Sequence, residues 1–171
     1  MQDLPTGYSL ATSPEDDTTN SNDEDCAATF EGLNEADNAD ESEQAKASFT
    51  GPGLGTILEQ GLESSDDEQV PEERLKDVIE VLSDCPTFST TEDGLKSAFS
   101  VSSLSSPKLG DDTVSLAAAI KNPEVSVGLN IVLVRLGRNV VSVTQEGLAT
   151  DVGALEQASR EGLDRLAAAT R

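Results

Sequence analysis

The stretch "VGLNIVLVRLGRNVVSVTQEG", residues 127–147, decides the fold class. It has the pattern of two long β-strands closed by a tight turn at Gly137-Arg138, where glycine can supply the positive φ that hairpin turns require. The turn sets the register of the two strands. On one face it pairs Val134 with Val141 and Val132 with Val143, and on the other face Arg135 with Val140, Leu133 with Ser142 and Ile131 with Thr144. The chain therefore contains an antiparallel sheet.

The second face of this hairpin is too apolar to stand in water. It carries Leu129, Ile131, Leu133 and Val140, with Arg135, Ser142, Thr144 and Glu146 as its polar members. We expect the terminal helix or the first two helices to cover it. The functional alternative is an apolar groove between sheet and helix, in which Arg135, Ser142 and Thr144 are the candidate ligand-binding residues and Arg135 meets an anionic headgroup or a carboxylate.

Outside the hairpin, period-two patterns predict further strands. Two lie just upstream, at residues 95–104, with Leu95, Ser97, Phe99 and Val101 on one side, and at residues 113–120, with Val114, Leu116, Ala118 and Ile120 on one side. Earlier strands are expected at residues 7–13, 45–51 and 55–64, the last two separated by the turn "GPGLG". A polar turn at residues 13–25 and a polar loop at residues 34–44 join the first elements.

Three helices complete the prediction. The first lies around residues 23–36. The second begins at Pro71, places Leu75, Val78, Ile79 and Leu82 on one face, and ends at Cys85-Pro86. The third is capped by Thr150 or Asp151 and places Val152, Leu155, Ala158, Leu163 and Leu166 on one stripe. The fold class is thus α+β: one domain over residues 1–171, with a central, largely antiparallel sheet of about six to seven strands and two to three packed helices.

The net charge of −22 is concentrated at the front of the chain. Residues 1–70 hold eighteen Asp and Glu against the single Lys46, whereas residues 71–171 hold fifteen against ten basic residues. Such a field repels phosphate backbones and anionic lipid headgroups, so neither nucleic acid nor direct membrane-surface binding is expected. No stretch approaches the ~20 apolar residues that a transmembrane span needs.

The residue inventory argues against an enzyme. The chain has no histidine, which excludes Ser-His-Asp and Cys-His catalysis and His-ligated zinc. We expect no catalytic residues, no cofactor and no metal. Calcium is the one ion worth weighing, because the acidic loop at residues 15–25 and the pair Asp111 and Asp112 offer oxygen ligands. EF-hand spacing is absent, and solvated turn residues explain these carboxylates better.

The two cysteines bear on the compartment. Cys26 lies in the first turn of the first expected helix and Cys85 at the end of the second. If these helices run antiparallel on one face of the sheet, the two residues come within disulfide distance. A disulfide would indicate an oxidising, extracytoplasmic location. The alternative is two unrelated buried thiols in a cytosolic protein.

Several motifs carry a resemblance to a known group of proteins: "DLPTGY" (3–8), "FEGL" (30–33) after Cys26, "ASFTG" (47–51), "LSDCPTF" (82–88), "LGDDTVSL" (109–116), "VLVRLGRNVVSV" (132–143) and "LDRLAAA" (163–169). On these, the chain resembles the mature part of small secreted lipoproteins of actinobacteria and the extracellular sensor domains of some actinobacterial serine/threonine kinases. It differs from the kinase domains in having one candidate disulfide where they tend to have two. The resemblance implies a mixed α/β sandwich, tethered to the membrane and without established catalysis.

These observations favour a non-enzymatic, exported cell-envelope lipoprotein domain with a sensor-like role. Its expected partner is a small amphiphilic ligand or an envelope protein, and its expected tether is a removed N-terminal lipidated segment. The alternative function is a cytosolic acidic interaction module that docks a basic partner.

Overall fold

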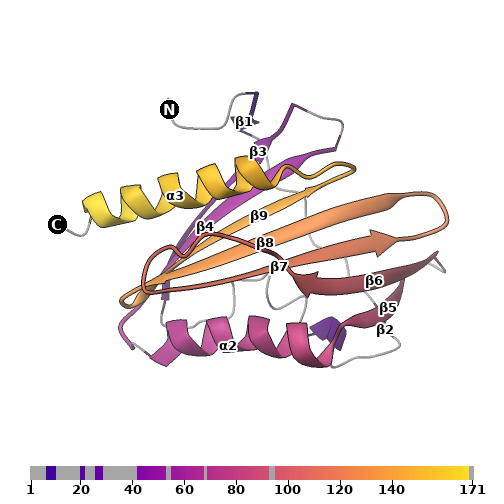
Figure 1. The fold of residues 1–171 in the computed structure, drawn as a ribbon, viewed down its shortest axis with the longest axis horizontal. Coiled ribbons are helices and arrows are strands. Elements are labelled where there is room, and N and C mark those ends of the chain that lie inside the picture. The colour runs from indigo at the N-terminus through magenta and orange to yellow at the C-terminus, as the bar shows by residue number, and fades with distance from the viewer. Residues whose placement is uncertain are drawn as a thin grey trace.

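The chain folds around one nine-stranded antiparallel sheet. The computed structural model describes residues 7–10, 20–21, 26–28, 42–52, 55–67, 69–92 and 95–169. The sheet has the order β1-β3-β4-β9-β8-β7-β6-β5-β2, and every neighbouring pair is antiparallel. Helix α2 lies on one face of the sheet and helix α3 on the other (Figure 1). The α+β class is confirmed.

Seven strands form the body of the sheet, and two strands of two residues each lie at its edges. The edge strands are β1 (Ser9–Leu10) and β2 (Asn20–Ser21). The long strands are β3 (Ser42–Thr50), β4 (Ile57–Ser65), β5 (Thr87–Glu92), β6 (Leu95–Ser103), β7 (Asp112–Lys121), β8 (Ser126–Leu136) and β9 (Asn139–Gly147). The helices are α2 (Gln69–Asp84) and α3 (Val152–Ala169). Six of the long strands, β3, β4, β6, β7, β8 and β9, were expected from the sequence, and the strand expected at residues 7–13 corresponds to the short edge strand β1.

The β8–β9 hairpin has the predicted register. Val134 pairs with Val141, Val132 with Val143, and Arg135 with Val140. Gly137 supplies the turn with a φ of +59°. Because both faces of this hairpin are apolar, it lies near the middle of the sheet with a helix on each side.

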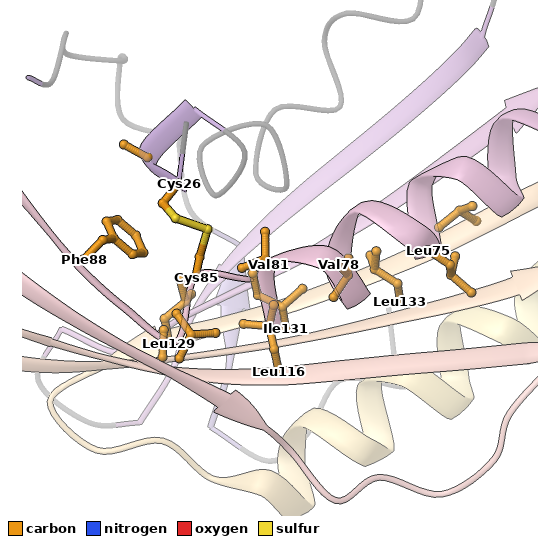
Figure 2. Packing of buried hydrophobic residues seen from close by; sticks show 14 residues of the cluster. Cys26, Leu75, Val78, Val81, Cys85, Phe88, Leu116, Leu129, Ile131 and Leu133 are labelled. Carbon is orange, nitrogen blue, oxygen red and sulfur yellow. A yellow bond between two sulfur atoms is a disulfide. The ribbon is translucent and has the colours of Figure 1, made fainter. Parts of the chain in front are cut away.

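Helix α2 covers the face that carries Ile131 and Leu133. Its buried residues Leu75, Val78 and Val81 pack into one cluster with Leu116 of β7 and with Leu129, Ile131, Leu133 and Val140 of the hairpin (Figure 2). The expectation that a helix covers this face is therefore correct.

Ile79 was expected on the packed face of α2, but its side chain is 51% exposed and Val81 is buried in its place. The buried residues follow one line along the helix: Leu75, Val78, Val81 and Cys85. Ile79 comes one residue after Val78, so it lies about 100° around the helix axis from Val78. The prediction for Ile79 was wrong.

Helix α3 covers the opposite face. Leu155, Ala158 and Leu166 are buried in a second cluster with Leu58, Val132, Val134, Val141 and Val143, and Leu163 packs against it. Asp151 caps the helix, because its Oδ1 accepts hydrogen bonds from the amides of Gly153 at 2.9 Å and Ala154 at 3.2 Å. Of the two predicted caps, Thr150 and Asp151, the second is correct.

Cys26 and Cys85 form a disulfide, with Cα atoms 5.6 Å apart (Figure 2). Residues 26–28 are helical, and the rest of the first expected helix, at residues 23–36, lies outside the described residues. The bond joins this segment to the end of α2, and both cysteines are buried in the α2-side cluster. It is the pairing expected from the sequence.

Strand β5 was missed by the sequence analysis. Its sequence, "TFSTTE", has one large apolar residue, Phe88, so the alternation of apolar and polar residues is weak. Phe88 stacks on Phe99 of β6 with ring centroids 4.5 Å apart. Its threonines suit a strand because they are β-branched, and β5 extends the sheet by one long strand beyond β6.

Candidate ligand-binding site

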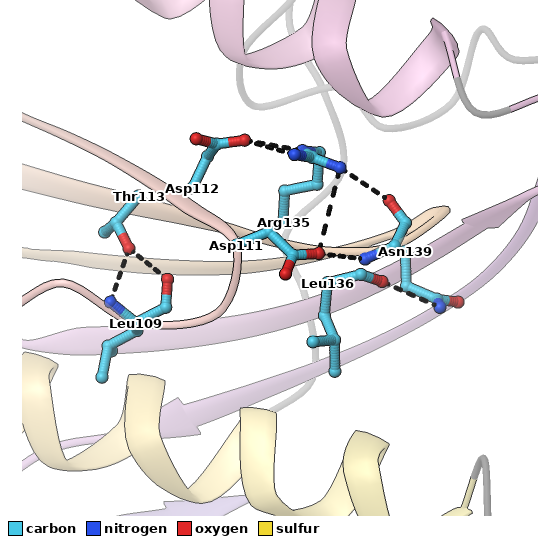
Figure 3. A network of polar contacts seen from close by, with 8 residues as sticks. Leu109, Asp111, Asp112, Thr113, Arg135, Leu136 and Asn139 are labelled. Atoms are coloured by element: carbon cyan, nitrogen blue, oxygen red, sulfur yellow. Dashed lines mark hydrogen bonds and ion pairs between the residues drawn. The ribbon is translucent and has the colours of Figure 1, made fainter.

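Arg135, the leading candidate from the sequence, lies at the end of β8 in a network of carboxylates. Its Nε donates a hydrogen bond to Asp112 Oδ2 at 2.9 Å, and its Nη1 lies 3.9 Å from Asp111 Oδ2 (Figure 3). Asp111 also accepts a hydrogen bond from the Gly137 amide at 2.7 Å. The hydrogen bond that Arg135 donates to Asp112 is the largest cause that raises the pKa of Arg135 above its ordinary value. The network fastens the start of β7 to the β8–β9 turn.

Of the carboxylates considered for calcium, Asp111 and Asp112 belong to this network, and those of the acidic loop at residues 15–25 lie outside the described residues. Asp112 binds Arg135, and Asp111 binds the Gly137 amide. Within the described residues, no three His, Cys, Asp or Glu side chains are grouped so that they could hold a metal ion.

Ser142 and Thr144 lie on the same face of the sheet as Arg135, on the neighbouring strand β9 and further from the β8–β9 turn. Ser142 packs over Gly61 of β4, where its hydroxyl occupies the space that a Cβ would need. Thr144 pairs with Glu59 of β4 and Ile131 of β8. Neither of the two cavities described below is lined by Arg135, Ser142 or Thr144. Their ligand-binding role stays a prediction.

A pocket of about 320 Å³ opens on the other face, between the second half of α3 and the β3–β4 hairpin. Its lining is mostly small or aliphatic: Ala45, Ala47, Leu62, Val141, Gly162 and Leu166. The volume lies in the range of small-molecule sites, which are concave and largely apolar. The pocket borders the α3-side core, since Val141 and Leu166 belong to the cluster and Ala47 and Leu62 pack against it.

Small residues create this pocket. Where β3 borders the pocket, its side chains on the α3 side are Ala45 and Ala47, and larger residues there would close the space. On α3, Gly162 lets the helix approach β4 so closely that a Cβ would overlap Nε2 of Gln60 and lie 3.1 Å from Val141 Cγ1. Gln60 uses that space to donate a hydrogen bond to the Ala158 carbonyl at 3.0 Å. The pocket is therefore held between two elements fixed by a direct contact.

Charged groups lie only at the border of the pocket. Arg165 of α3 is exposed and lines it. Lys46 also lines it, but Lys46 alternates with Ala45 and Ala47 along β3, so its side chain points to the other face of the sheet, where it forms an ion pair with Glu59 at 3.0 Å. An apolar floor with one cationic side chain at its border can take an alkyl or similar apolar group and leave a polar end in solvent.

This pocket was not predicted from the sequence. Alternating alanines in "AKA" and one glycine inside a helical pattern were the available signals, but they show only that space is left. Which elements face that space depends on where α3 docks.

Two solved structures share the fold. The extracellular domain of PknH from Mycobacterium tuberculosis superimposes with a TM-score of 0.66 at 11% sequence identity, over 95% of this chain and 86% of that one. A putative uncharacterized protein from Mycobacterium smegmatis, the ortholog of Rv0999, superimposes with a TM-score of 0.53 at 14% identity, over 94% of this chain and 90% of that one. At these identities the likeness shows the fold. No protein-family model and no curated protein matches the sequence.

In the parts of the chain that the structure describes, neither helix is long and apolar enough to cross a membrane.

Proposed function

We propose that this chain is a non-catalytic, sensor-like domain of the cell envelope that binds an apolar or amphiphilic ligand in the pocket between α3 and the β3–β4 hairpin. The observation that carries the proposal is the pocket itself. It is a concave, mostly aliphatic opening of about 320 Å³ in a sheet whose central strands are otherwise closely packed under two helices.

The disulfide supports the extracytoplasmic part of the proposal. A buried crosslink between Cys26 and Cys85 is typical of proteins from oxidising compartments. It weighs against the alternative of a cytosolic acidic module. The likeness to an extracellular domain of a mycobacterial protein agrees with an extracytoplasmic location. The sequence resemblance to actinobacterial lipoproteins agrees with a lipid anchor as the tether.

The absence of histidine from the chain supports the non-catalytic part. Histidine is the side chain that most often acts as a general base at neutral pH. Asp112 is held in an ion pair with Arg135, and Asp151 caps helix α3.

A dye-displacement experiment tests ligand binding. The protein is titrated with an environment-sensitive hydrophobic dye, and dodecanoate is then added as a competitor. Ala45→Phe fills the pocket from β3 at an exposed position and should weaken both dye and dodecanoate binding about tenfold or more. Ala98→Phe on β6 is the matched control, because Ala98 is also an exposed strand alanine and four strands separate β6 from β3. It should leave binding unchanged.

Equal effects of the two substitutions, or no saturable dye binding by the native protein, would remove the pocket from the proposal. The compartment is tested separately by a thiol assay on protein isolated from its source. Two reactive thiols under denaturing, non-reducing conditions would contradict the extracytoplasmic assignment.

A further inference from the structure

A second cavity lies at the other end of α3 and differs in chemistry from the apolar pocket. It has a volume of about 530 Å³ and lies where the segment before β1, the β3–β4 turn, the end of β9 and the first turn of α3 meet. Hydrogen-bonding side chains reach it from all four of these elements: Tyr8, Thr56, Gln145, Asp151 and Gln157. Convergence of polar groups from separate elements is typical of a specific small-molecule site.

The wall of this cavity is held in a defined geometry. Gln145 is completely buried, and its Nε2 donates a hydrogen bond to the Tyr8 hydroxyl at 2.8 Å. Its Oε1 accepts a hydrogen bond from the Asp151 amide at 2.7 Å. The Tyr8 ring is wedged against the backbone of Gly51, where a Cβ would lie 2.8 Å from Tyr8 Cε1 and 2.9 Å from Thr56 Cγ2. One buried amide thus positions both a phenol and the start of α3.

This arrangement leaves hydrogen-bonding capacity for a ligand. Because the Tyr8 hydroxyl accepts from Gln145, its own hydrogen needs another acceptor, and the described residues provide none. Asp151 Oδ1 is taken by the amides of Gly153 and Ala154, while Oδ2 has no partner in the described part of the chain. The helix terminus is therefore already capped by protein, and the groups that remain for a ligand are side-chain donors and acceptors.

The charge of the lining narrows the class of ligand. Among the described residues that line the cavity there is no Lys or Arg, and the one charged group is the Asp151 carboxylate. Phosphates, sulfates and carboxylates would therefore meet no cationic side chain among these residues and would be repelled by Asp151. The Tyr8 ring, Pro52 and two alanines add flat apolar surface between the polar groups. Amide, hydroxyl and carboxylate groups beside apolar surfaces suit a molecule that has both hydroxyl groups and C–H faces.

We propose that this cavity binds a neutral, polyhydroxylated ligand of the saccharide class, at a site separate from the apolar pocket. The hydroxyl groups of such a ligand would accept from Tyr8, donate to Asp151 Oδ2 and exchange hydrogen bonds with Gln157, while its C–H face lies against the ring of Tyr8. This proposal does not rest on amphiphile binding, and each of the two is tested on different residues.

The chain offers its own reporter for this site. It has one tyrosine and no tryptophan, so its intrinsic emission comes from Tyr8. Titration of the full chain with maltose and with N,N′-diacetylchitobiose should produce a saturable change in tyrosine emission for at least one of them. Calorimetry with the same sugars should give the same affinity. The Tyr8→Phe variant has no tyrosine emission, so its binding is measured by calorimetry, and it should bind the sugars more weakly.

Two exposed positions supply the variants. Gln157→Ala should weaken sugar binding roughly three- to tenfold, the range for one lost hydrogen bond. Asp151→Asn keeps an efficient helix cap and should weaken binding by a similar factor. Gln69→Ala and Asp164→Asn change the same residue types at exposed positions away from the cavity, and they should bind as the native protein does.

Three results would overturn the proposal. One is the absence of saturable binding of either sugar to the native protein. Another is binding that Gln157→Ala and Asp151→Asn leave unchanged. The third is a larger response to tetramethylammonium chloride or to inorganic phosphate than to the sugars, which would indicate recognition of charge.

Discussion

Gly162 of α3 lies directly against the side chain of Gln60 on β4. The amide of Gln60 reaches across the position that a Cβ would occupy and donates a hydrogen bond to the carbonyl of Ala158, one turn earlier in α3, at 3.0 Å. This contact joins strand β4 to helix α3, and Gln60 and Gly162 form one wall of the apolar pocket. A glycine in the middle of a helix is therefore explained by close packing.

The contact predicts a non-additive response to substitution. A glycine inside a helix costs about 1 kcal/mol relative to alanine, so Gly162→Ala would stabilise an isolated helix. Here the new methyl group displaces the Gln60 amide and breaks its hydrogen bond, and we expect little or no net gain. In a Gln60→Ala background the same change should be more favourable and should raise the free energy of unfolding by at most about 1 kcal/mol, because only Val141 Cγ1, at 3.1 Å, then crowds the new methyl group.

Urea unfolding of the four proteins in this cycle measures the coupling. Gly153→Ala, at the exposed start of the same helix, is the control: its new methyl group would lie 3.2 Å from Asp151 Oδ1 and away from Gln60, so its effect should not depend on Gln60. If Gly162→Ala were equally favourable in both backgrounds, the proposed packing role of Gly162 would be wrong.

The disulfide should make a large contribution to stability. Closing a loop with a sequence separation of 59 residues is worth roughly 4 kcal/mol in the chain-entropy description. In a chain of this size, each kcal/mol moves the melting temperature by about 2–4 °C. Reduction, or the double substitution Cys26→Ser with Cys85→Ser, should therefore lower the melting temperature by on the order of 10 °C.

Differential scanning calorimetry with and without reductant checks this expectation. The double variant provides the control, because it should not respond to reductant. A native protein that melts at the same temperature under both conditions would show that the crosslink does not constrain the unfolded chain.

The sequence predicted the centre of the sheet better than its ends. In the β8–β9 hairpin, apolar residues occupy both faces and Gly137 marks the turn, and the position of the turn sets which residues pair. The sequence was less informative where the same pattern of apolar residues allows two orientations of a helix on the sheet. In α2 the run "VIEVL" (78–82) offers more apolar residues than one face can hold, and only the docking of the helix selects Val81 over Ile79.

The pockets were beyond sequence analysis for a physical reason. The apolar pocket exists because Ala45, Ala47 and Gly162 leave space between elements far apart in the chain. The polar cavity joins Tyr8 to Gln145, which are separated by 137 residues. Local patterns carry information about neighbours within a strand or helix, whereas these sites depend on how α3 lies across the sheet.

Arg135 provides a test that separates a structural role from a binding role. Its guanidinium bridges Asp112 and Asp111 at the solvent-exposed end of the hairpin. Arg135→Ala should lower the melting temperature, by less than reduction of the disulfide does, because exposed ion pairs contribute little. It should not change dodecanoate binding at the apolar pocket.

Arg138→Ala is the matched control for this change. Arg138 is an exposed arginine in the same turn, and it pairs with Asp66, which is almost fully exposed, so its loss should affect stability even less. Weaker amphiphile binding by Arg135→Ala with unchanged stability would support the sequence-based prediction of a ligand site at Arg135, Ser142 and Thr144.

The last prediction concerns Glu146 on β9 and the dependence of stability on pH. Partial burial, and secondarily the nearby Glu59 carboxylate, raise the pKa of Glu146 above its ordinary value of 4.5. A raised folded-state pKa means that the folded protein holds this proton more tightly than the unfolded chain does. Its contribution to stability is fully present below the ordinary pKa and is lost as the pH rises through the folded-state pKa. Glu146→Gln keeps the shape and removes the charge, so it should gain stability relative to the native protein as the pH rises from ~4 to ~7. Urea unfolding across this range measures the difference, with Glu80→Gln on the exposed side of α2 as the control. A constant difference between Glu146→Gln and the native protein at every pH would contradict the assignment.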